Sequence, residues 1–125
     1  MSLGKVLIVD DEPEVRQLLL EFLAGRGYDV RVAESGSAAL VALGADHPDL
    51  VLLDVTMPDM DGVETLRRIV ALQPSMPVIM VTANADIGTT SKLLAMGAVD
   101  YIPKPFDLDY LDQAVSIQVA AVQDR

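Results

Sequence analysis

The chain has 125 residues and a formal net charge of −10, from 9 Lys and Arg residues against 19 Asp and Glu residues. This length is enough for one domain with a buried core, and the negative charge disfavours binding to nucleic acid or to anionic lipid. The absence of Cys excludes a disulfide framework and thiol chemistry. No apolar stretch approaches the ~18 residues of a membrane span, so we expect a soluble, cytoplasmic protein.

Short apolar runs alternate with amphipathic stretches along the whole chain. Continuous apolar runs of this length are typical of strands that are buried on both faces of a sheet. The predicted strands are Lys5–Val9, Tyr28–Ala33, Leu50–Leu53, Pro77–Val81 and Val99–Ile102. Each is followed by a stretch with helical periodicity.

The first predicted helix starts near Pro13 and ends near Gly25 and Gly27, which are typical residues for those positions. Its apolar residues recur at helical spacing and are expected to face inward: Val15, Leu18, Leu19, Phe22 and Leu23. A second helix is expected at about 37–44, after a Ser35 cap.

A third helix is expected to end before Pro74, with an inner face of Val63, Leu66, Ile69 and Val70 and an outer face of Arg67 and Arg68. A fifth is expected at about 108–122, with Leu111, Ala114, Val115 and Val119 inward. The fourth follows Asp86 and opens with four residues that are poorer helix formers than Ala, namely Gly88, Thr89, Thr90 and Ser91. This start fits an ordinary capped surface helix and a mobile switch element equally well.

Strands that are each followed by a helix predict the α/β class. Parallel strands need crossover connections, and these are right-handed and usually helical. We therefore expect a single doubly wound (βα)5 domain, with a five-stranded parallel sheet and helices on both faces. In such sheets ligands bind beyond the carboxyl ends of the strands, where the strand order reverses.

Polar residues follow the predicted strands at that edge. Asp10 and Asp11 follow the first strand, Asp54 the third, Thr82 the fourth, and Lys104 the fifth. Two unit charges ~4 Å apart repel by roughly 4 kcal/mol at an effective dielectric constant near 20. Three carboxylates there would therefore raise a pKa or recruit a cation, and an all-oxygen site suits Mg²⁺ best, with Mn²⁺ as the alternative.

Such a site could receive a phosphoryl group. Asp54 is the better nucleophile candidate because it stands alone, whereas Asp10 and Asp11 are adjacent and can share an ion. Lys104 would neutralise phosphoryl oxygens, and Thr82 would donate a hydrogen bond to one of them. Acids after strands are more often helix caps or solvated loop residues, which is the interpretation of Asp59, Asp61, Asp86 and Asp107; His47 receives no role.

Four motifs, "VDDE", "LLDVTMPDMDG", "VTA" and "DYIPKPF", together resemble the receiver domain of bacterial two-component response regulators. The resemblance covers about residues 4–122 and implies the flavodoxin-like, CheY-like fold. We therefore expect one receiver domain over 1–125, with no output domain in the chain.

The resemblance implies a role for each matching residue. Asp54 would be the phosphoacceptor, and Lys104 the phosphate-binding lysine. Mg²⁺ would be held by Asp54, by Asp11 directly, by Asp10 largely through water, and by the backbone carbonyl of Thr56. The implied switch pair is Thr82 and Tyr101, the implied cis peptide bond precedes Pro105, and the implied tight turn after the phosphoacceptor contains Pro58 and Gly62.

The resemblance also implies the partners. A sensor histidine kinase or a histidine phosphotransfer protein would donate the phosphoryl group, and the face formed by the fourth helix, fifth strand and fifth helix would contact an output domain or protein. The phosphoryl group would later be lost by autodephosphorylation, at a rate tuned by Thr56 and Asn84. Winged-helix members pair through a basic residue at the position of Ala114, so we expect a monomer or a weak phosphorylation-dependent dimer, without direct nucleic-acid or membrane binding.

Three other functions are weighed against this one. A phosphatase of the haloacid dehalogenase type needs a second acid two residues after the nucleophile, where this chain has Thr56. A receiver fold that acts only as an unphosphorylated docking module would show no Mg²⁺-dependent labelling. A nucleotide-binding protein would need a Gly-rich loop after a strand. This chain lacks one, because Gly25 and Gly27 follow a predicted helix and not a strand.

Overall fold

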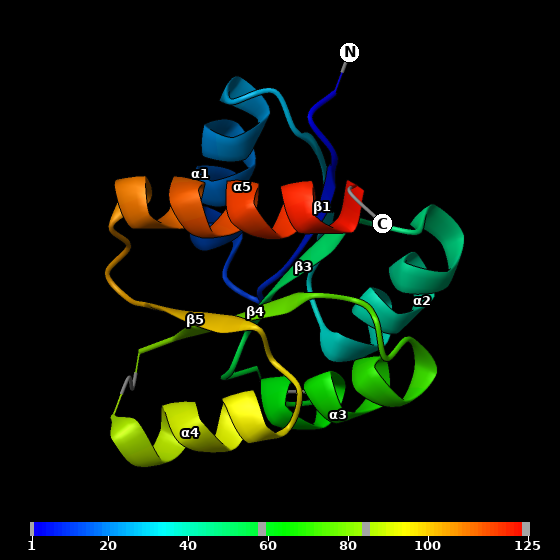
Figure 1. The fold of residues 1–125 in the computed structure, drawn as a ribbon, viewed down its shortest axis with the longest axis vertical. Coiled ribbons are helices and arrows are strands. Elements are labelled where there is room, and N and C mark those ends of the chain that lie inside the picture. The colour runs from blue at the N-terminus through cyan, green and yellow to red at the C-terminus, as the bar shows by residue number, and fades with distance from the viewer. Residues whose placement is uncertain (1, 58–59, 84–85, 124–125) are drawn as a thin grey trace.

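The structure is a computed structural model that describes residues 2–57, 60–83 and 86–123, and it shows strands that alternate with helices (Figure 1). The strands are β1 (Lys5–Val9), β2 (Asp29–Ala33), β3 (Leu50–Asp54), β4 (Val78–Thr82) and β5 (Asp100–Pro103). The helices are α1 (Pro13–Gly25), α2 (Gly36–Asp46), α3 (Gly62–Leu72), α4 (Ile87–Ala95) and α5 (Leu108–Gln123). The predicted α/β class and order of elements are confirmed.

The five strands form one parallel sheet in the order β2-β1-β3-β4-β5. The strand order reverses between β1 and β3, where Val9 pairs with Leu53. The residues that follow this pair, Asp10 and Asp54, therefore lie side by side at the switch point. This is the position at which doubly wound sheets bind their ligands.

Helices cover both faces of the sheet, with α1 and α5 on one face and α2, α3 and α4 on the other (Figure 1). Side chains from β1 alternate between the two cores, since Val6 and Ile8 face α1 and α5 while Leu7 and Val9 face α2 and α3. Both sets are buried, which explains the unbroken apolar runs in the sequence. Within the described ranges, no helix has the length and apolar character needed to cross a membrane.

Side-chain caps begin several of the helices. The Ser35 hydroxyl accepts a hydrogen bond from the Ala38 N–H at 3.1 Å, as predicted for α2. Carboxylates of Asp61, Asp86 and Asp107 accept backbone N–H groups in the first turns of α3, α4 and α5. The interpretation of these three acids as caps is confirmed, and Asp59 lies outside the described residues.

The first turn of α4 uses its threonines locally. Thr90 is 6% exposed, and its hydroxyl donates to the Asp86 carbonyl at 3.0 Å. The Thr89 N–H donates to the Asp86 carboxylate at 2.7 Å. These contacts are those of a capped surface helix and account for the polar residues at this end.

Two sequence predictions need correction. Leu18 was expected to face inward but is 46% exposed, because α1 turns only Leu19 and Leu23 fully against the sheet. The strand bounds also differ: β3, β4 and β5 each end one residue later than predicted, at Asp54, Thr82 and Pro103, and β2, β4 and β5 each begin one residue later. Pairing continues past the apolar runs there, since backbone hydrogen bonds do not depend on side-chain polarity.

Candidate functional site

Two buried carboxylates stand at the carboxyl edge of the sheet. Asp10 follows β1, and its N–H donates to the Ala33 carbonyl at 3.1 Å, which extends the pairing with β2 by one residue. Asp54 is the last residue of β3, and the Val55 N–H after it donates to the Val81 carbonyl at 3.0 Å. The backbone is held on both strands, and the residues Asp10 and Asp54 are only 1% and 3% exposed.

Four carboxyl groups come together at this edge. One oxygen each from Asp10, Asp11, Glu12 and Asp54 lies within 4.8 Å of the others. Four acids around a common centre supply the hard oxygen ligands that Mg²⁺ prefers. The residues present therefore fit the predicted divalent cation.

Lys104 is the cation that the fold places among these acids. Its Nζ lies 3.4 Å from Asp54 Oδ1, 3.6 Å from Asp10 Oδ2 and 3.5 Å from Glu12 Oε1. The Lys104 N–H donates to the Thr82 carbonyl at 2.8 Å, so the backbone is fixed to the end of β4. The peptide bond between Lys104 and Pro105 is cis.

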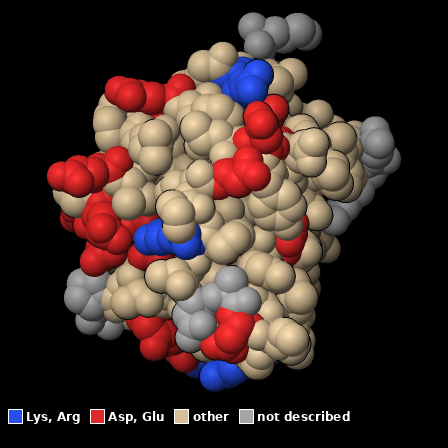
Figure 2. Space-filling view, turned by 90° about the vertical axis from the view of Figure 1, so that its left-hand side faces the viewer, with Lys and Arg blue, Asp and Glu red and all other residues tan. Residues whose placement is uncertain are grey.

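A cavity of about 340 Å³ opens at the acids and the lysine. The residues that line it are Asp11, Glu12, Asp54, Thr56, Ala83 and Lys104. Figure 2 shows the molecule from the side where β4 and β5 end, and acidic side chains outnumber basic ones on this face. A small anionic group that enters the cavity would reach Asp54 and Lys104 together.

The surroundings shift the pKa values of the central groups. Burial, with the nearby Asp10 carboxylate, raises the pKa of Asp54 to about 6, although Lys104 and the Thr56 N–H oppose the shift. Burial also raises the pKa of Asp10. For Lys104 burial lowers the pKa, but the carboxylates of Asp10, Asp54 and Glu12 outweigh it and the net shift is upward. Lys104 thus stays charged, while Asp10 and Asp54 hold their protons more tightly than free carboxyl groups do. A divalent cation bound here would favour their ionised form.

The loop after β3 lies close to Asp54. The Thr56 N–H donates to Asp54 Oδ1 across a long 3.4 Å contact, and Thr56 lines the cavity. The Gly62 N–H donates to the Val55 carbonyl at 2.8 Å. A Cβ at position 62 would lie 2.1 Å from the Asp54 carbonyl oxygen, so only glycine allows α3 to begin against this loop. Pro58, the other predicted turn residue, lies outside the described residues.

The predicted switch residues lie on neighbouring strands. Thr82 is 2% exposed at the end of β4, and Tyr101 is half-buried in β5, opposite Met80. Of the residues that the structure describes, Thr82 is not among those that line the cavity. Asn84, which the resemblance places near the site, lies outside the described ranges.

Glu12 and Ala83 are site residues that the sequence reasoning did not assign. Glu12 joins the acid cluster and contacts Lys104. The third consecutive acid after the first strand was the available signal for it. Ala83 follows Thr82 and lines the cavity, and an alanine carries no chemical signal in a sequence.

Comparison with known proteins agrees with this geometry. A family model described as the response regulator receiver domain matches residues 6–116. Regulatory protein AtoC of Escherichia coli is 41% identical over 114 residues, which cover 91% of this chain and 25% of AtoC. The DNA-binding transcriptional regulator NtrC of Salmonella typhimurium is 39% identical over 125 residues, which cover 100% of this chain and 27% of NtrC. The chain thus spans about a quarter of the length of these two relatives.

Solved structures show the same fold. A CheY-like response regulator receiver domain protein from Methanospirillum hungatei JF-1 superposes with a TM-score of 0.91 at 31% identity, covering 98% of both chains. NtrX from Brucella abortus superposes with a TM-score of 0.90 at 31% identity, covering 98% of this chain and 28% of NtrX.

The fold and the acidic switch-point cavity define a CheY-like domain of the flavodoxin-like class. The chain belongs to the response regulator receiver domain family, the signalling domains of two-component systems. Phosphorylation and Mg²⁺ binding are typical of that family.

Proposed function

We propose that Asp54 is the phosphoacceptor of this receiver domain, with Lys104 as its catalytic partner. The observation that carries the proposal is the 3.4 Å contact between Lys104 Nζ and a buried Asp54 carboxylate that lines an open cavity. A carboxylate is a competent nucleophile toward phosphorus when a cation offsets the repulsion of the phosphoryl oxygens. Asp10 is buried and is not among the residues that line the cavity, whereas Asp54 is buried and lines it.

The donor is a phosphohistidine on a sensor kinase or a phosphotransfer protein. One Asp54 oxygen attacks the phosphorus, the new P–O bond forms, the P–N bond breaks, and the imidazole nitrogen leaves with the electron pair. Lys104 remains against the transferred group and offsets its negative charge. Asp10, Asp11, Asp54 and the Thr56 carbonyl would hold Mg²⁺, which when bound supplies a second positive charge toward the phosphoryl oxygens.

Loss of the phosphoryl group returns the domain to its starting state. Water attacks the phosphorus, the bond to Asp54 breaks, and inorganic phosphate leaves while the carboxylate is restored. The residue two positions after Asp54 is Thr56, which cannot act as the general acid of a phosphomonoesterase. We therefore propose a domain that catalyses its own phosphorylation and dephosphorylation, and not a turnover enzyme.

Thr82 and Tyr101 would transmit the modification. The Thr82 hydroxyl donates to a phosphoryl oxygen, and the half-buried Tyr101 ring turns inward into the space that Thr82 leaves. Tyr101 pairs with Met80, two residues before Thr82 on the adjacent strand, and this proximity supports the coupling. The face made by α4, β5 and α5 then changes shape and acts on an output domain or protein, as a population shift between two states.

The test of the phosphoacceptor is intact-mass measurement after incubation with acetyl phosphate and Mg²⁺. The native chain should gain about 80 Da, the mass of one phosphoryl group, and Asp54→Asn should gain nothing. Asp49→Asn, at the opposite end of β3, is the matched control and should be labelled like the native chain. No adduct on the native chain would favour the docking module, and rapid turnover of a phosphomonoester would favour the phosphatase.

The switch is tested by amide hydrogen exchange. Beryllofluoride, which mimics the phosphoryl group, should change exchange at 88–91 in the first turns of α4 in the native chain. The variant Asp54→Asn should show no such change. Unaltered exchange in the native chain with bound beryllofluoride would contradict the proposed coupling through Thr82 and Tyr101.

A further inference from the structure

The turn between β1 and α1 carries three of the four clustered acids, Asp10, Asp11 and Glu12. It lacks the side-chain cap that begins α2, α3 and α4. Glu12 is at the N-cap position of α1 but makes no side-chain capping hydrogen bond, and Pro13 follows it. Something other than a helix cap must therefore hold this turn in place.

Asp10 takes part in three hydrogen bonds that do so, one as the donor and two as the acceptor. The Asp10 N–H donates to the Ala33 carbonyl at 3.1 Å, and the Glu12 N–H donates to Asp10 Oδ1 at 2.9 Å. The third comes from a distant side chain, because Arg16 Nη1 donates to the Asp10 carbonyl oxygen at 2.7 Å. Arg16 is half-buried and lies in α1, one turn beyond the acids.

The position of that carbonyl determines the geometry of the acids. The carbonyl of Asp10 and the N–H of Asp11 belong to one rigid, planar peptide unit. When the Arg16 guanidinium fixes the oxygen, it also fixes the direction in which the chain leaves toward Asp11. The relative orientation of the two carboxylates therefore depends on a residue that is not itself in the cluster.

We propose that Arg16 is a positioning residue for the divalent-cation site, and this proposal rests on the function proposed above. Arg16 holds the peptide plane between Asp10 and Asp11 so that their carboxylates face one centre. Mg²⁺ requires near-ideal octahedral geometry, whereas Ca²⁺ accepts irregular arrangements of oxygen ligands. Loss of Arg16 should therefore weaken Mg²⁺ binding more than Ca²⁺ binding.

The charge of Arg16 predicts the opposite effect. A guanidinium beside an acidic cluster repels a divalent cation, so its removal alone would tighten the binding of Mg²⁺ and Ca²⁺ alike. Positioning and charge thus differ in the sign of the change in Mg²⁺ affinity. This difference in sign makes the proposal decidable.

The experiment is a titration of the ¹⁵N-labelled 125-residue chain with MgCl₂ and separately with CaCl₂, followed by amide chemical shifts at residues 10–12 and 54–56. Arg16→Met keeps an apolar stem but removes the donors, and its Kd for Mg²⁺ should rise about tenfold, the lower end of the range for outer-shell partners. Its Kd for Ca²⁺ should rise by less than about threefold. Arg16→Lys, which keeps a donor, should recover part of the lost Mg²⁺ affinity.

The matched control is the residue that caps the carboxyl end of the same helix. Arg26, at the other end of α1, stacks on Phe22 and pairs with Asp112 at 3.6 Å. Arg26→Met makes the same change in charge and should leave the Kd for Mg²⁺ within twofold of the native value. If Arg16→Met does not fold, Arg16→Gln takes its place with the same expected direction.

The outcomes separate this proposal from the one it rests on. Equal or tighter Mg²⁺ binding by the folded Arg16 variant, or equal weakening for Mg²⁺ and Ca²⁺, overturns the positioning role. That result leaves the proposed function intact if the native chain binds Mg²⁺ and is labelled at Asp54. A native chain that neither binds Mg²⁺ nor accepts a phosphoryl group overturns both.

Discussion

The two ends of strand β3 each carry an aspartate, and their surroundings are opposite in character. Asp49 precedes the strand; its carboxylate accepts the Lys5 N–H at 2.9 Å, and its own N–H donates to the Lys5 carbonyl at 2.8 Å. Asp54 ends the strand among other acids, with Lys104 as the nearby cation. One acid therefore completes the backbone pairing, while the other is held in an environment that raises its pKa.

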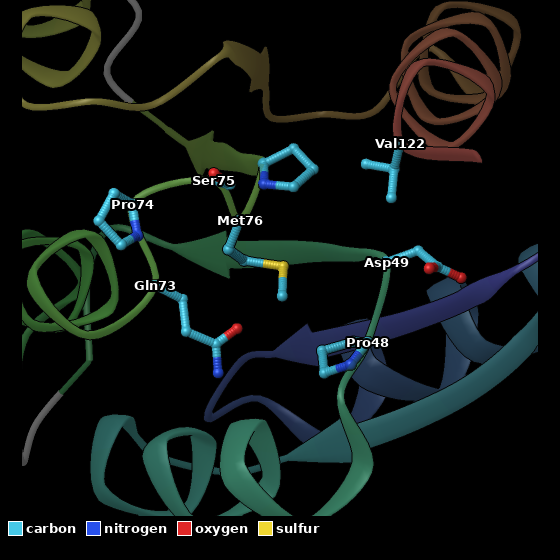
Figure 3. A pocket seen from close by; sticks show the side chains of 8 residues that line it. Pro48, Asp49, Gln73, Pro74, Ser75, Met76 and Val122 are labelled. Carbon is cyan, nitrogen blue, oxygen red and sulfur yellow. The ribbon is translucent and has the colours of Figure 1, made fainter. Parts of the chain in front are cut away.

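The cavities at the two ends have the same volume but different linings. At the amino end a cavity of about 340 Å³ lies between the loops before β3 and β4 and the end of α5 (Figure 3). Its lining consists of Pro48, Asp49, Gln73, Pro74, Ser75, Met76, Pro77 and Val122. At the carboxyl end the same volume is lined by three acids and a lysine. A cavity of this size is therefore present at both ends of β3, and what distinguishes the carboxyl end is its cluster of carboxylates.

The largest expected difference between the ends is in phosphorylation. Lys104→Met removes the cation beside Asp54 and should lower the initial rate of labelling by acetyl phosphate by roughly 10²- to 10³-fold, as for other donors that stabilise developing charge. Asp49→Ala should stay within about twofold of the native rate, since it is at the far end of the strand. The measurement is the time course of the mass adduct. If Lys104→Met is labelled at nearly the native rate, Lys104 does not assist phosphorylation and the two ends of the strand do not differ in this respect.

The second difference is in stability against pH. The folded-state pKa of Asp54, about 6, is above its ordinary value of 3.8, so the folded state binds the proton more tightly and loses stability as the pH rises through this range. Asp54→Asn should therefore raise the free energy of unfolding by on the order of 2 to 3 kcal/mol above pH 6. The gain should disappear below about pH 4. Urea unfolding in EDTA at both pH values measures it, and a gain that does not depend on pH would contradict the assignment.

The third difference is the response to Mg²⁺. At ten times its dissociation constant, Mg²⁺ should stabilise the native chain by ~1.4 kcal/mol if it binds only the folded state. Asp11→Asn should reduce this stabilisation, and Asp49→Asn should retain it in full. Thermal unfolding with and without MgCl₂ gives the comparison. Equal stabilisation of the native chain and Asp11→Asn would place the ion elsewhere.

The smallest difference concerns Asp49 itself. Asp49→Ala removes the acceptor of the Lys5 N–H and should lower the free energy of unfolding by ~1 kcal/mol. The sign is opposite to that expected for Asp54→Asn at neutral pH, although both changes remove an acid from the same strand. Urea unfolding at pH 7.5 measures the free energy of unfolding of both variants. An Asp49→Ala variant that is more stable than the native chain would contradict the expected difference in sign.

The sequence was sufficient to predict most of the fold. Strands β1, β3 and β4 are buried on both faces, so their residues form continuous apolar runs that are easy to recognise. Strand ends were less certain, because Asp54 and Thr82 pair through their backbones while their polar side chains signal a loop. The prediction that Leu18 faces inward was wrong for a related reason. Helical spacing identifies the apolar face of a helix, but it does not show which residues at the margin of that face are buried.

For the site, the sequence predicted which strand ends would meet but not which groups would touch. Parallel strands bring Asp10 and Asp54 to one edge whatever their side chains do. The reach of Glu12 to Lys104 and of Arg16 to the Asp10 carbonyl depends on side-chain conformation and on the path of one turn. The pairing of Asp49 with Lys5 was missed because an acid before a strand is usually a solvated loop residue.

The contact between Gly62 and the Asp54 backbone limits how this chain can evolve. The Cβ of any other residue at position 62 would overlap the Asp54 carbonyl oxygen, so no alternative fits without moving the acid itself. Arg67 and Arg68, further along α3, are exposed and pair with Glu64 at the surface, where other side chains fit without a clash. In a saturation library, position 62 should be intolerant of every alternative, a constraint imposed by shape on a residue that performs no chemistry.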